Sequence, residues 1–234
     1  MKTDLHPALR NVAAVIFDVG GTLVHPDWPR LSDLVAVETG ILFTPTQMTE
    51  AFYAMLQLVD SELITQSTTK PTPESHWTFL ETFRSLGIDE TAFKNIRTRL
   101  KVAHEDQHLW CKPDPAAATV LRCLKRAGLR IAAISNTEDG RVNESLALAG
   151  LDSELEFLID SHNVGLRKPD AAIFQLALDR LELQAREAAY VGDSFGHDVI
   201  GAQRAGLYPI LLDRSAAYAG VAFTRISSLR ELVT

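Results

Sequence analysis

The sequence predicts an α/β fold, in which helices flank a parallel β-sheet and a long helical segment is inserted into the first half of the chain. Three observations carry this prediction. Short apolar runs without polar alternation recur along the 234 residues, as expected of strands that are buried on both faces. Stretches with apolar residues at helical spacing separate most of these runs, which is the alternation of a doubly wound fold. One long segment has the helical period only.

The core elements follow from these patterns in chain order. A helix is predicted over 114–129, where the apolar spacing is helical and Gly128 gives a stop signal. A second helix is predicted within 169–183, starting after Pro169, where the apolar residues again follow helical spacing. The predicted strands are the apolar runs 12–17, 130–135, 156–161, 188–194 and 208–213.

The long helical segment predicts a second structural unit. We expect residues 1–25 and 109–234 to form the α/β core and residues 26–108 to form a helical cap, since no strand candidate interrupts the helical periods there. The borders of this segment contain two proline-marked connections, HPDWP (25–29) and CKPDP (111–115). Such connections suit a hinge between a core and a lid.

Composition and charge argue against several functional classes. Apolar residues make up 46% of the chain and charged residues 23%, as in an ordinary packed protein. The net charge of -7 disfavours a nucleic-acid partner, which needs a basic face, but still allows a small metal-bound anion. The sequence shows no apolar stretch typical of a signal peptide or a membrane span, and Cys111 and Cys123 have no C-x-x-C spacing. We therefore expect a cytoplasmic protein without a membrane partner.

Four short motifs follow predicted strands, at the edge where open α/β sheets bind ligands. The first, FDVGGT, places Asp18 directly after a strand. A carboxylate can attack a phosphoryl group and form an aspartyl phosphate, which water then cleaves. The glycines of this motif allow a sharp turn and a close approach to an anion, and Thr22 adds a hydroxyl and an amide.

The other three motifs supply groups that bind phosphate or metal. In ISNT, Ser135 and Asn136 lie between a strand and a helix, where hydroxyls and free amides can hold phosphate oxygens. In GLRKPD, Lys168 can balance the charges of a nucleophile and a phosphoryl group. In VGDSFGHD, Asp193 and Asp198 follow a strand, and carboxylates that converge there suit Mg²⁺.

These motifs, in this order, resemble those of the haloacid dehalogenase-like superfamily of phosphohydrolases. The resemblance covers roughly residues 10–25 and 110–234, and the helical segment matches the position of that family's C1-type cap. It implies a Rossmann-like core, an Asp18 nucleophile assisted by Lys168, Mg²⁺ as cofactor and a small phosphorylated metabolite as substrate. It also implies a phosphate-binding set of Thr22, Ser135, Asn136 and Lys168 and a metal-binding set of Asp18, Gly20, Asp193 and Asp198.

Gly20 departs from the family pattern. The family's phosphatases usually carry an aspartate there, whose side chain protonates the leaving oxygen and later activates water, while its backbone carbonyl reaches the metal. Gly20 keeps the carbonyl but has no carboxylate. Because general acid/base catalysis contributes about 10² to 10⁴ in rate, we expect a slowed hydrolase that favours good leaving groups. His25 is the nearest titratable side chain after the motif and a candidate substitute proton carrier.

Two other readings stay open at this point. A fold retained as a ligand-binding or protein-interaction module is one, and a phosphotransferase or dehalogenase-like hydrolase is the other. The family's dehalogenases carry a tyrosine where this chain has Gly20, and its phosphonatases use a cap lysine, but residues 23–69 contain no lysine. Trp28, His76 and Trp77 either line a pocket under the cap or belong to its core. The protein is expected to be a monomer or a homodimer.

Overall fold

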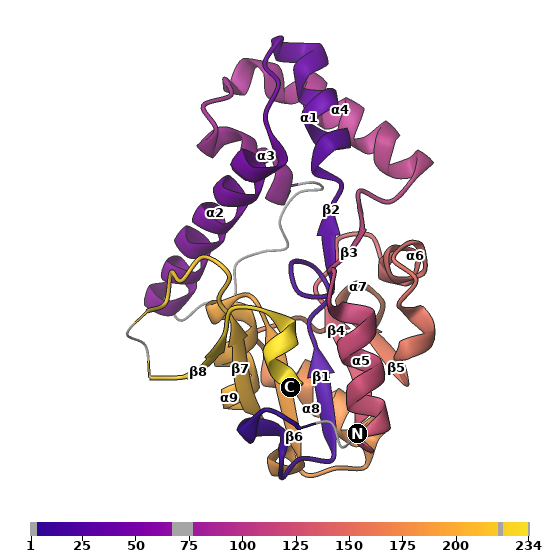
Figure 1. Cartoon of the computed structure of the whole chain (residues 1–234). Coiled ribbons are helices and arrows are strands. Elements are labelled where there is room, and N and C mark those ends of the chain that lie inside the picture. The colour runs from indigo at the N-terminus through magenta and orange to yellow at the C-terminus, as the bar shows by residue number, and fades with distance from the viewer. Residues whose placement is uncertain (1–3, 67–76, 220–221, 234) are drawn as a thin grey trace.

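The core is a six-stranded, fully parallel sheet with the strand order β5-β4-β1-β6-β7-β8. It is seen in a computed structural model that describes residues 4–66, 77–219 and 222–233 (Figure 1). The parallel sheet and the Rossmann-like α/β fold are therefore confirmed. The strands are β1 (Ala14–Phe17), β4 (Arg130–Ser135), β5 (Phe157–Asp160), β6 (Ala188–Gly192), β7 (Tyr208–Leu212) and β8 (Thr224–Ile226).

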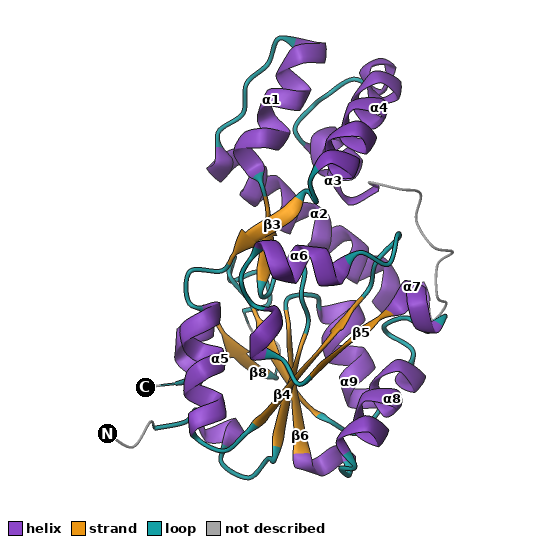
Figure 2. Ribbon diagram, turned by 90° about the vertical axis from the view of Figure 1, so that its right-hand side faces the viewer, coloured by secondary structure: helices purple, strands orange, loops and turns teal. Residues whose placement is uncertain are grey.

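Helices cover both faces of this sheet because its strands are apolar on both sides (Figure 2). Alternate residues of β1 point to opposite faces of the sheet. Val15 and Phe17 pack in one core cluster, and Ala14 and Ile16 pack in the other. The helices α5 and α6 contribute to the first cluster, and α8 and α9 to the second. Their bounds are α5 (Ala117–Arg126), α6 (Val142–Leu148), α7 (Ser161–Val164), α8 (Ala171–Leu181) and α9 (Ile200–Arg204).

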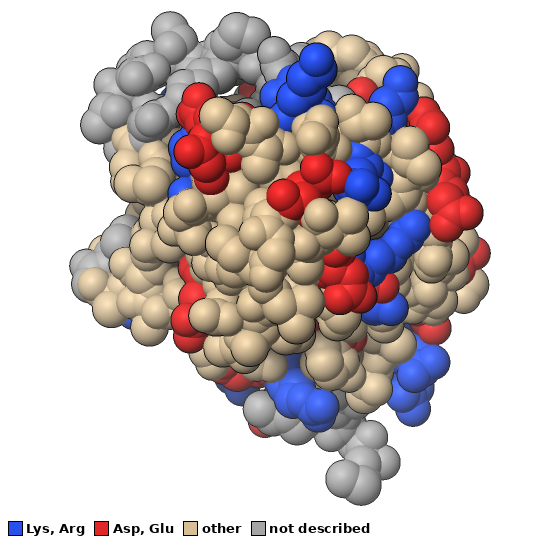
Figure 3. Space-filling model, turned by 90° about the horizontal axis from the view of Figure 1, so that it is seen from above, with Lys and Arg blue, Asp and Glu red and all other residues tan. Residues whose placement is uncertain are grey.

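The long helical segment contains α1 (Trp28–Thr39), α2 (Pro45–Gln66), α3 (Trp77–Ser85) and α4 (Glu90–Asp106), which we call the helical insertion. It lies beyond the carboxyl ends of the strands and packs around an apolar cluster of its own (Figure 1). Trp28 is buried in this cluster, whereas His76 and the side chain of Trp77 lie outside the described residues. The outer face of the insertion carries acidic and basic side chains side by side (Figure 3).

Two short strands join the insertion to the core. The connections expected to form a hinge pair as an antiparallel sheet of β2 (Val24–Pro26) and β3 (Trp110–Pro113), with an irregular register between His25 and Pro26. Hinge motion at this pair stays a prediction, as do the exact borders of the two units. Among the described residues, no helix has the length and apolar character needed to cross a membrane.

Candidate active site

Asp18 lies at the centre of the sheet edge because β1 pairs with both β4 and β6. Its backbone amide still donates to Val191 of β6, at 2.8 Å, and the chain then turns sharply. Gly21 makes this turn at a φ of 84°, in the left-handed region. A β-carbon at Gly21 would come within 2.0 Å of an Asp193 carboxylate oxygen, so the missing side chain leaves room for that carboxylate.

Lys168 joins the motifs through three contacts of its ammonium group. The Nζ atom lies 2.5 Å from Asp18 Oδ1, 2.7 Å from Asp198 Oδ1 and 3.0 Å from the hydroxyl of Tyr190. Asn136 holds the backbone of Lys168 at both ends: its side-chain oxygen accepts from Lys168 N and its amide donates to Lys168 O. The side-chain amide of Asn136 thus positions Lys168 rather than facing the cavity with free polar atoms.

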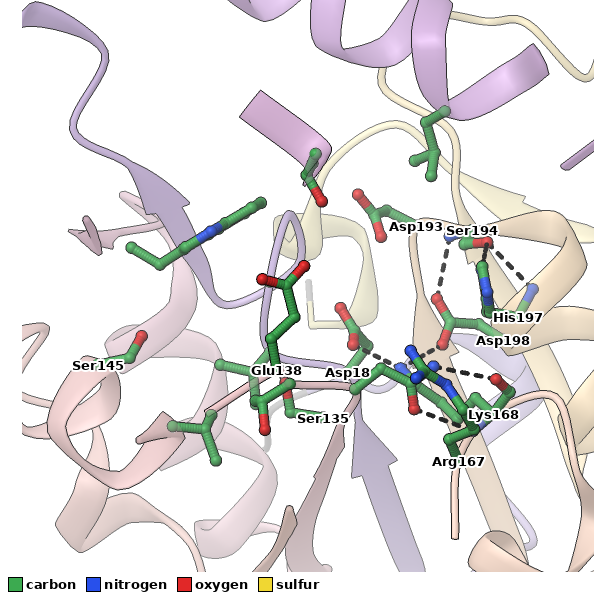
Figure 4. Close-up of a pocket in the computed structure, with 18 of the residues that line it drawn as sticks. Asp18, Ser135, Glu138, Ser145, Arg167, Lys168, Asp193, Ser194, His197 and Asp198 are labelled. Atoms are coloured by element: carbon green, nitrogen blue, oxygen red, sulfur yellow. Dashed lines mark hydrogen bonds and ion pairs between the residues drawn. The ribbon is translucent and has the colours of Figure 1, made fainter. Parts of the chain in front are cut away.

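Three buried carboxylates share this single ammonium group. Asp18, Asp193 and Asp198 are each exposed by 6% or less, and one oxygen of each lies within 4.8 Å of the others (Figure 4). Burial raises the pKa of Asp18 to about 6 against the opposing charge of Lys168, and it raises that of Asp193 well above the ordinary value. The cluster therefore has more negative than positive charge when its carboxylates ionise.

The donor set fits a divalent cation. Asp18 Oδ2 and Asp193 Oδ2 are buried, and within the described part of the chain neither accepts a hydrogen bond. Such orphaned oxygens are costly unless a cation or a proton satisfies them. Carboxylate oxygens from separate strand ends are the ligands that Mg²⁺ prefers. The chemistry of these residues therefore fits a site for Mg²⁺.

Mg²⁺ is expected to stabilise the protein strongly. At about 100 times its Kd, a ligand adds about 2.7 kcal/mol, which corresponds to a rise in Tm of roughly 5 to 10 °C for a chain of this size. The pKa of Asp18 is raised to about 6 in the folded protein, so the metal-free protein loses stability as the pH rises toward and past this value. Because Mg²⁺ binds the ionised carboxylates, its stabilising effect should be larger at pH 8 than at pH 5. Thermal unfolding with Mg²⁺ or EDTA measures it.

The matched control is Asp193→Asn. This variant removes one negative charge from the crowded cluster, so its metal-free Tm should equal or exceed that of the unmodified protein. Its response to Mg²⁺ should be largely lost. An unchanged Mg²⁺ response in Asp193→Asn would contradict the assignment of this carboxylate to the metal.

All predicted site residues except Thr22 line one cavity of about 250 Å³ (Figure 4). Thr22 is fully buried beside Asp18 and does not line it, and His25 lies elsewhere, in a second cavity, with its Nε2 atom 3.3 Å from Asp114. His197 lines the first cavity, and burial lowers its pKa to about 4. The predicted residues that line the first cavity are Asp18, Gly20, Ser135, Asn136, Lys168, Asp193 and Asp198.

A family model described as haloacid dehalogenase-like hydrolase matches residues 12–206, which include all four motifs. The chain belongs to this family. Among solved structures, the haloacid dehalogenase-like chain is similar to a hydrolase of the same family from Bacillus subtilis, at a TM-score of 0.67 and 18% identity over 95% of this chain and 97% of that one. A dehalogenase matches at a TM-score of 0.65 and 21% identity over 95% and 96%. At these identities the likeness shows the fold alone.

Curated relatives include proteins named for phosphatase activity. A mouse protein named haloacid dehalogenase-like hydrolase domain-containing protein 3 is 35% identical over 57% of this chain and 53% of its own length. Glyceraldehyde 3-phosphate phosphatase of Methanopyrus kandleri is 27% identical over 87% and 84%. Phosphoserine phosphatase of Thermus thermophilus is 36% identical over 43% and 40%. The match to the mouse protein thus spans about half of that relative's length.

Asp60, which no sequence motif singled out, ties the helical insertion of this haloacid dehalogenase-like chain to its fourth motif. Its carboxylate is fully buried and accepts from Ser194 Oγ at 2.6 Å, Phe195 N at 2.7 Å, Gly196 N at 2.9 Å and the hydroxyl of Tyr218. A signal existed in the sequence. Asp60 lies four and eight residues after Leu56 and Phe52, on the apolar face of its helix, where a lone carboxylate needs partners.

Sequence analysis also missed Trp110, which covers Gly20. A β-carbon added to Gly20 would lie 3.4 Å from the six-membered ring of Trp110, an ordinary contact distance. Trp110 in turn stacks on Phe79 of α3, with ring centroids 5.6 Å apart, and meets Phe52 of α2 edge-on at 5.8 Å. An indole ring therefore borders the position where the family's phosphatases carry their acid/base aspartate.

Proposed function

We propose that this chain is a Mg²⁺-dependent phosphohydrolase that acts on a small phosphomonoester through an aspartyl phosphate on Asp18. The observation that carries the proposal is the buried cluster in which Lys168 bridges Asp18 and Asp198 within one cavity. Two relatives named as phosphatases support the same reaction class. Residues 26–108 would act as a cap that closes over the substrate and limits the access of water.

The nucleophile is the carboxylate of Asp18, one oxygen of which is held by Lys168. A carboxylate oxygen of Asp18 attacks phosphorus, the bond from phosphorus to the leaving oxygen breaks, and the leaving group takes up a proton from water. Water then attacks phosphorus, which releases inorganic phosphate and regenerates the Asp18 carboxylate. Lys168 compensates the negative charge in both steps.

The surrounding residues bind and orient the phosphoryl group. Ser135, at the end of β4, would offer its hydroxyl to a phosphoryl oxygen, whereas the buried Thr22 does not line the cavity. Asp18, Asp193, Asp198 and the Gly20 carbonyl would hold Mg²⁺. When bound, this ion supplies positive charge that favours the phosphoryl anion. Asp60 holds α2 against the segment between Asp193 and Asp198. This contact would fix the position of the cap relative to the two carboxylates.

An activated aryl phosphate with Mg²⁺ should give a burst of phenolate followed by slow turnover. The phenolate leaves without protonation, so the first step proceeds, but no side chain at Gly20 activates water for the second step. We expect a burst of about one equivalent per protein and a steady rate about 10²-fold or more below the burst rate. Stopped-flow absorbance on the millisecond-to-minute scale measures both phases.

Other outcomes point to different functions. Mg²⁺ and a phosphate analogue that bind without any burst or turnover would favour a binding module and overturn the hydrolase proposal. Halide release from a haloacid without added metal would favour dehalogenase chemistry instead. Turnover without a burst would be consistent with the hydrolase proposal and would show that dephosphorylation is not rate-limiting.

A further inference from the structure

The helical insertion presents an apolar wall to the cavity that contains Asp18. Thr78, His104 and His108 are its polar lining residues among those described, and the remainder are apolar. Both ring nitrogens of His104 already have partners, Asp139 and the backbone amide of Leu109. Trp110, at the start of β3, extends this wall through its ring contacts with Phe52 and Phe79. The apolar lining residues on this side are Phe52, Met55, Leu56, Val59, Phe79 and Trp110.

The described cations of the cavity all come from the core and already face carboxylates. Lys168 contacts Asp18 and Asp198, and Arg167 interacts with Glu138. No described Lys or Arg of the insertion lines the cavity. A charged or polyhydroxylated leaving group placed against the apolar side chains of this wall would lose its water and gain few partners in return, which is unfavourable.

The geometry of phosphoryl transfer directs the leaving group toward this wall. The attacking and leaving oxygens lie roughly in line with phosphorus, and Asp18 attacks from the core. The leaving group therefore projects toward the insertion. Near Gly20 the neighbouring surface is the six-membered ring of Trp110, whose carbon atoms carry no acidic proton for an alkoxide. A phenol, with a pKa near 10, leaves far more easily than an alcohol under these conditions.

We infer that the substrate is a phosphate ester of an apolar, aromatic hydroxyl compound rather than of a sugar, a polyol or an amino acid. The inference rests on the proposed function and specifies its substrate class. The cavity of about 250 Å³ has room for an aromatic ring, since apolar cavities of about 150 Å³ bind benzene. Aromatic rings also gain from edge and stacked contacts with neighbours such as Phe52 and Trp110.

Two phosphonates of equal heavy-atom number test the inference without any turnover. Phenylphosphonate presents a ring and 3,4-dihydroxybutylphosphonate presents a polar chain. In the presence of Mg²⁺, calorimetry should show at least about 10-fold tighter binding of phenylphosphonate, which is about 1.4 kcal/mol. Inorganic phosphate serves as the reference ligand because it does not reach the apolar wall.

Leu56→Gln and Leu58→Gln form a matched pair on α2. Leu56 is half-buried and lines the cavity, whereas Leu58 is 67% exposed and does not line it. Leu56→Gln should weaken the binding of phenylphosphonate about 5- to 10-fold, because a polar side chain then faces the ring. The affinity for inorganic phosphate should stay unchanged. Leu58→Gln should change neither affinity. Val59→Gln repeats the test from a second lining position if Leu56→Gln does not fold.

The outcomes separate the inference from the proposed function. Equal or tighter binding of the dihydroxybutyl compound, or equal effects of Leu56→Gln and Leu58→Gln, would overturn the aromatic substrate class while the hydrolase proposal stands. A protein that binds neither phosphonate and no inorganic phosphate would contradict the proposed function itself, and the substrate class with it.

Discussion

Asp18→Asn is expected to lower kcat/KM for an aryl phosphate by about 10⁴-fold or more and to abolish the burst of phenolate. In asparagine the nitrogen lone pair is delocalised and the remaining oxygen carries no full negative charge, so neither atom is a competent nucleophile toward phosphorus. Under the proposed mechanism, the covalent intermediate therefore no longer forms. Single-turnover kinetics and intact mass measurement of the phosphorylated protein test both effects.

The loss in Asp18→Asn should not come from unfolding. Burial raises the pKa of Asp18 to about 6, so a neutral amide relieves part of the crowding among the three carboxylates. Lys168 keeps its ion pair with Asp198 at 2.7 Å, which holds the loop in place. The Tm of the metal-free variant should therefore equal or exceed that of the unmodified protein. A folded variant that keeps more than about one hundredth of the activity would exclude Asp18 as the nucleophile.

The core could be predicted from the sequence because its signals are local. A central parallel strand is apolar on both faces, and the runs around Val15 and Ala133 show this directly. The register of the strands then aligns their ends. Phe17 pairs with Ala133 and with Val191, so the residues that follow at the ends of these three strands meet at one edge of the sheet. The convergence of Asp18, Ser135 and Asp193 follows from strand pairing rather than from any one motif.

The features that sequence analysis missed depend on contacts between distant segments. The strand β8 has three residues, too few for a clear period, and β2 and β3 form only because residues 24–26 and 110–113 meet across the insertion. Trp110 is 90 positions from Gly20, and its place over that residue is set by aromatic contacts with the insertion. The sequence places Asn136 near the site. Its two hydrogen bonds with the Lys168 backbone depend on the conformation of the loops and could not be predicted from the sequence.

Gly20→Asp is expected to raise the steady-state turnover of an alkyl phosphate such as benzyl phosphate by about 10²-fold. A carboxyl group beside the leaving oxygen can donate a proton in the first step and accept one from water in the second. The backbone of Gly20 lies outside the left-handed region, so an aspartate causes no backbone strain there. With an activated aryl phosphate the first step should change little, but the burst should vanish because dephosphorylation no longer limits.

The position of Trp110 limits how much the turnover of benzyl phosphate rises in Gly20→Asp. The added β-carbon would meet the ring of Trp110 at 3.4 Å, an ordinary contact, so the ring is the nearest neighbour of a side chain introduced here. Gly20→Asn has the same shape without proton transfer and serves as the control, and combining each change with Trp110→Ala makes room for the new side chain. A benzyl phosphate rate in Gly20→Asp, Trp110→Ala that equals that of Gly20→Asn, Trp110→Ala would show that the missing carboxylate does not limit this enzyme. A gain confined to the double variant would instead mean that Trp110 excludes an acid/base group from this position, as the apolar wall around the leaving group implies.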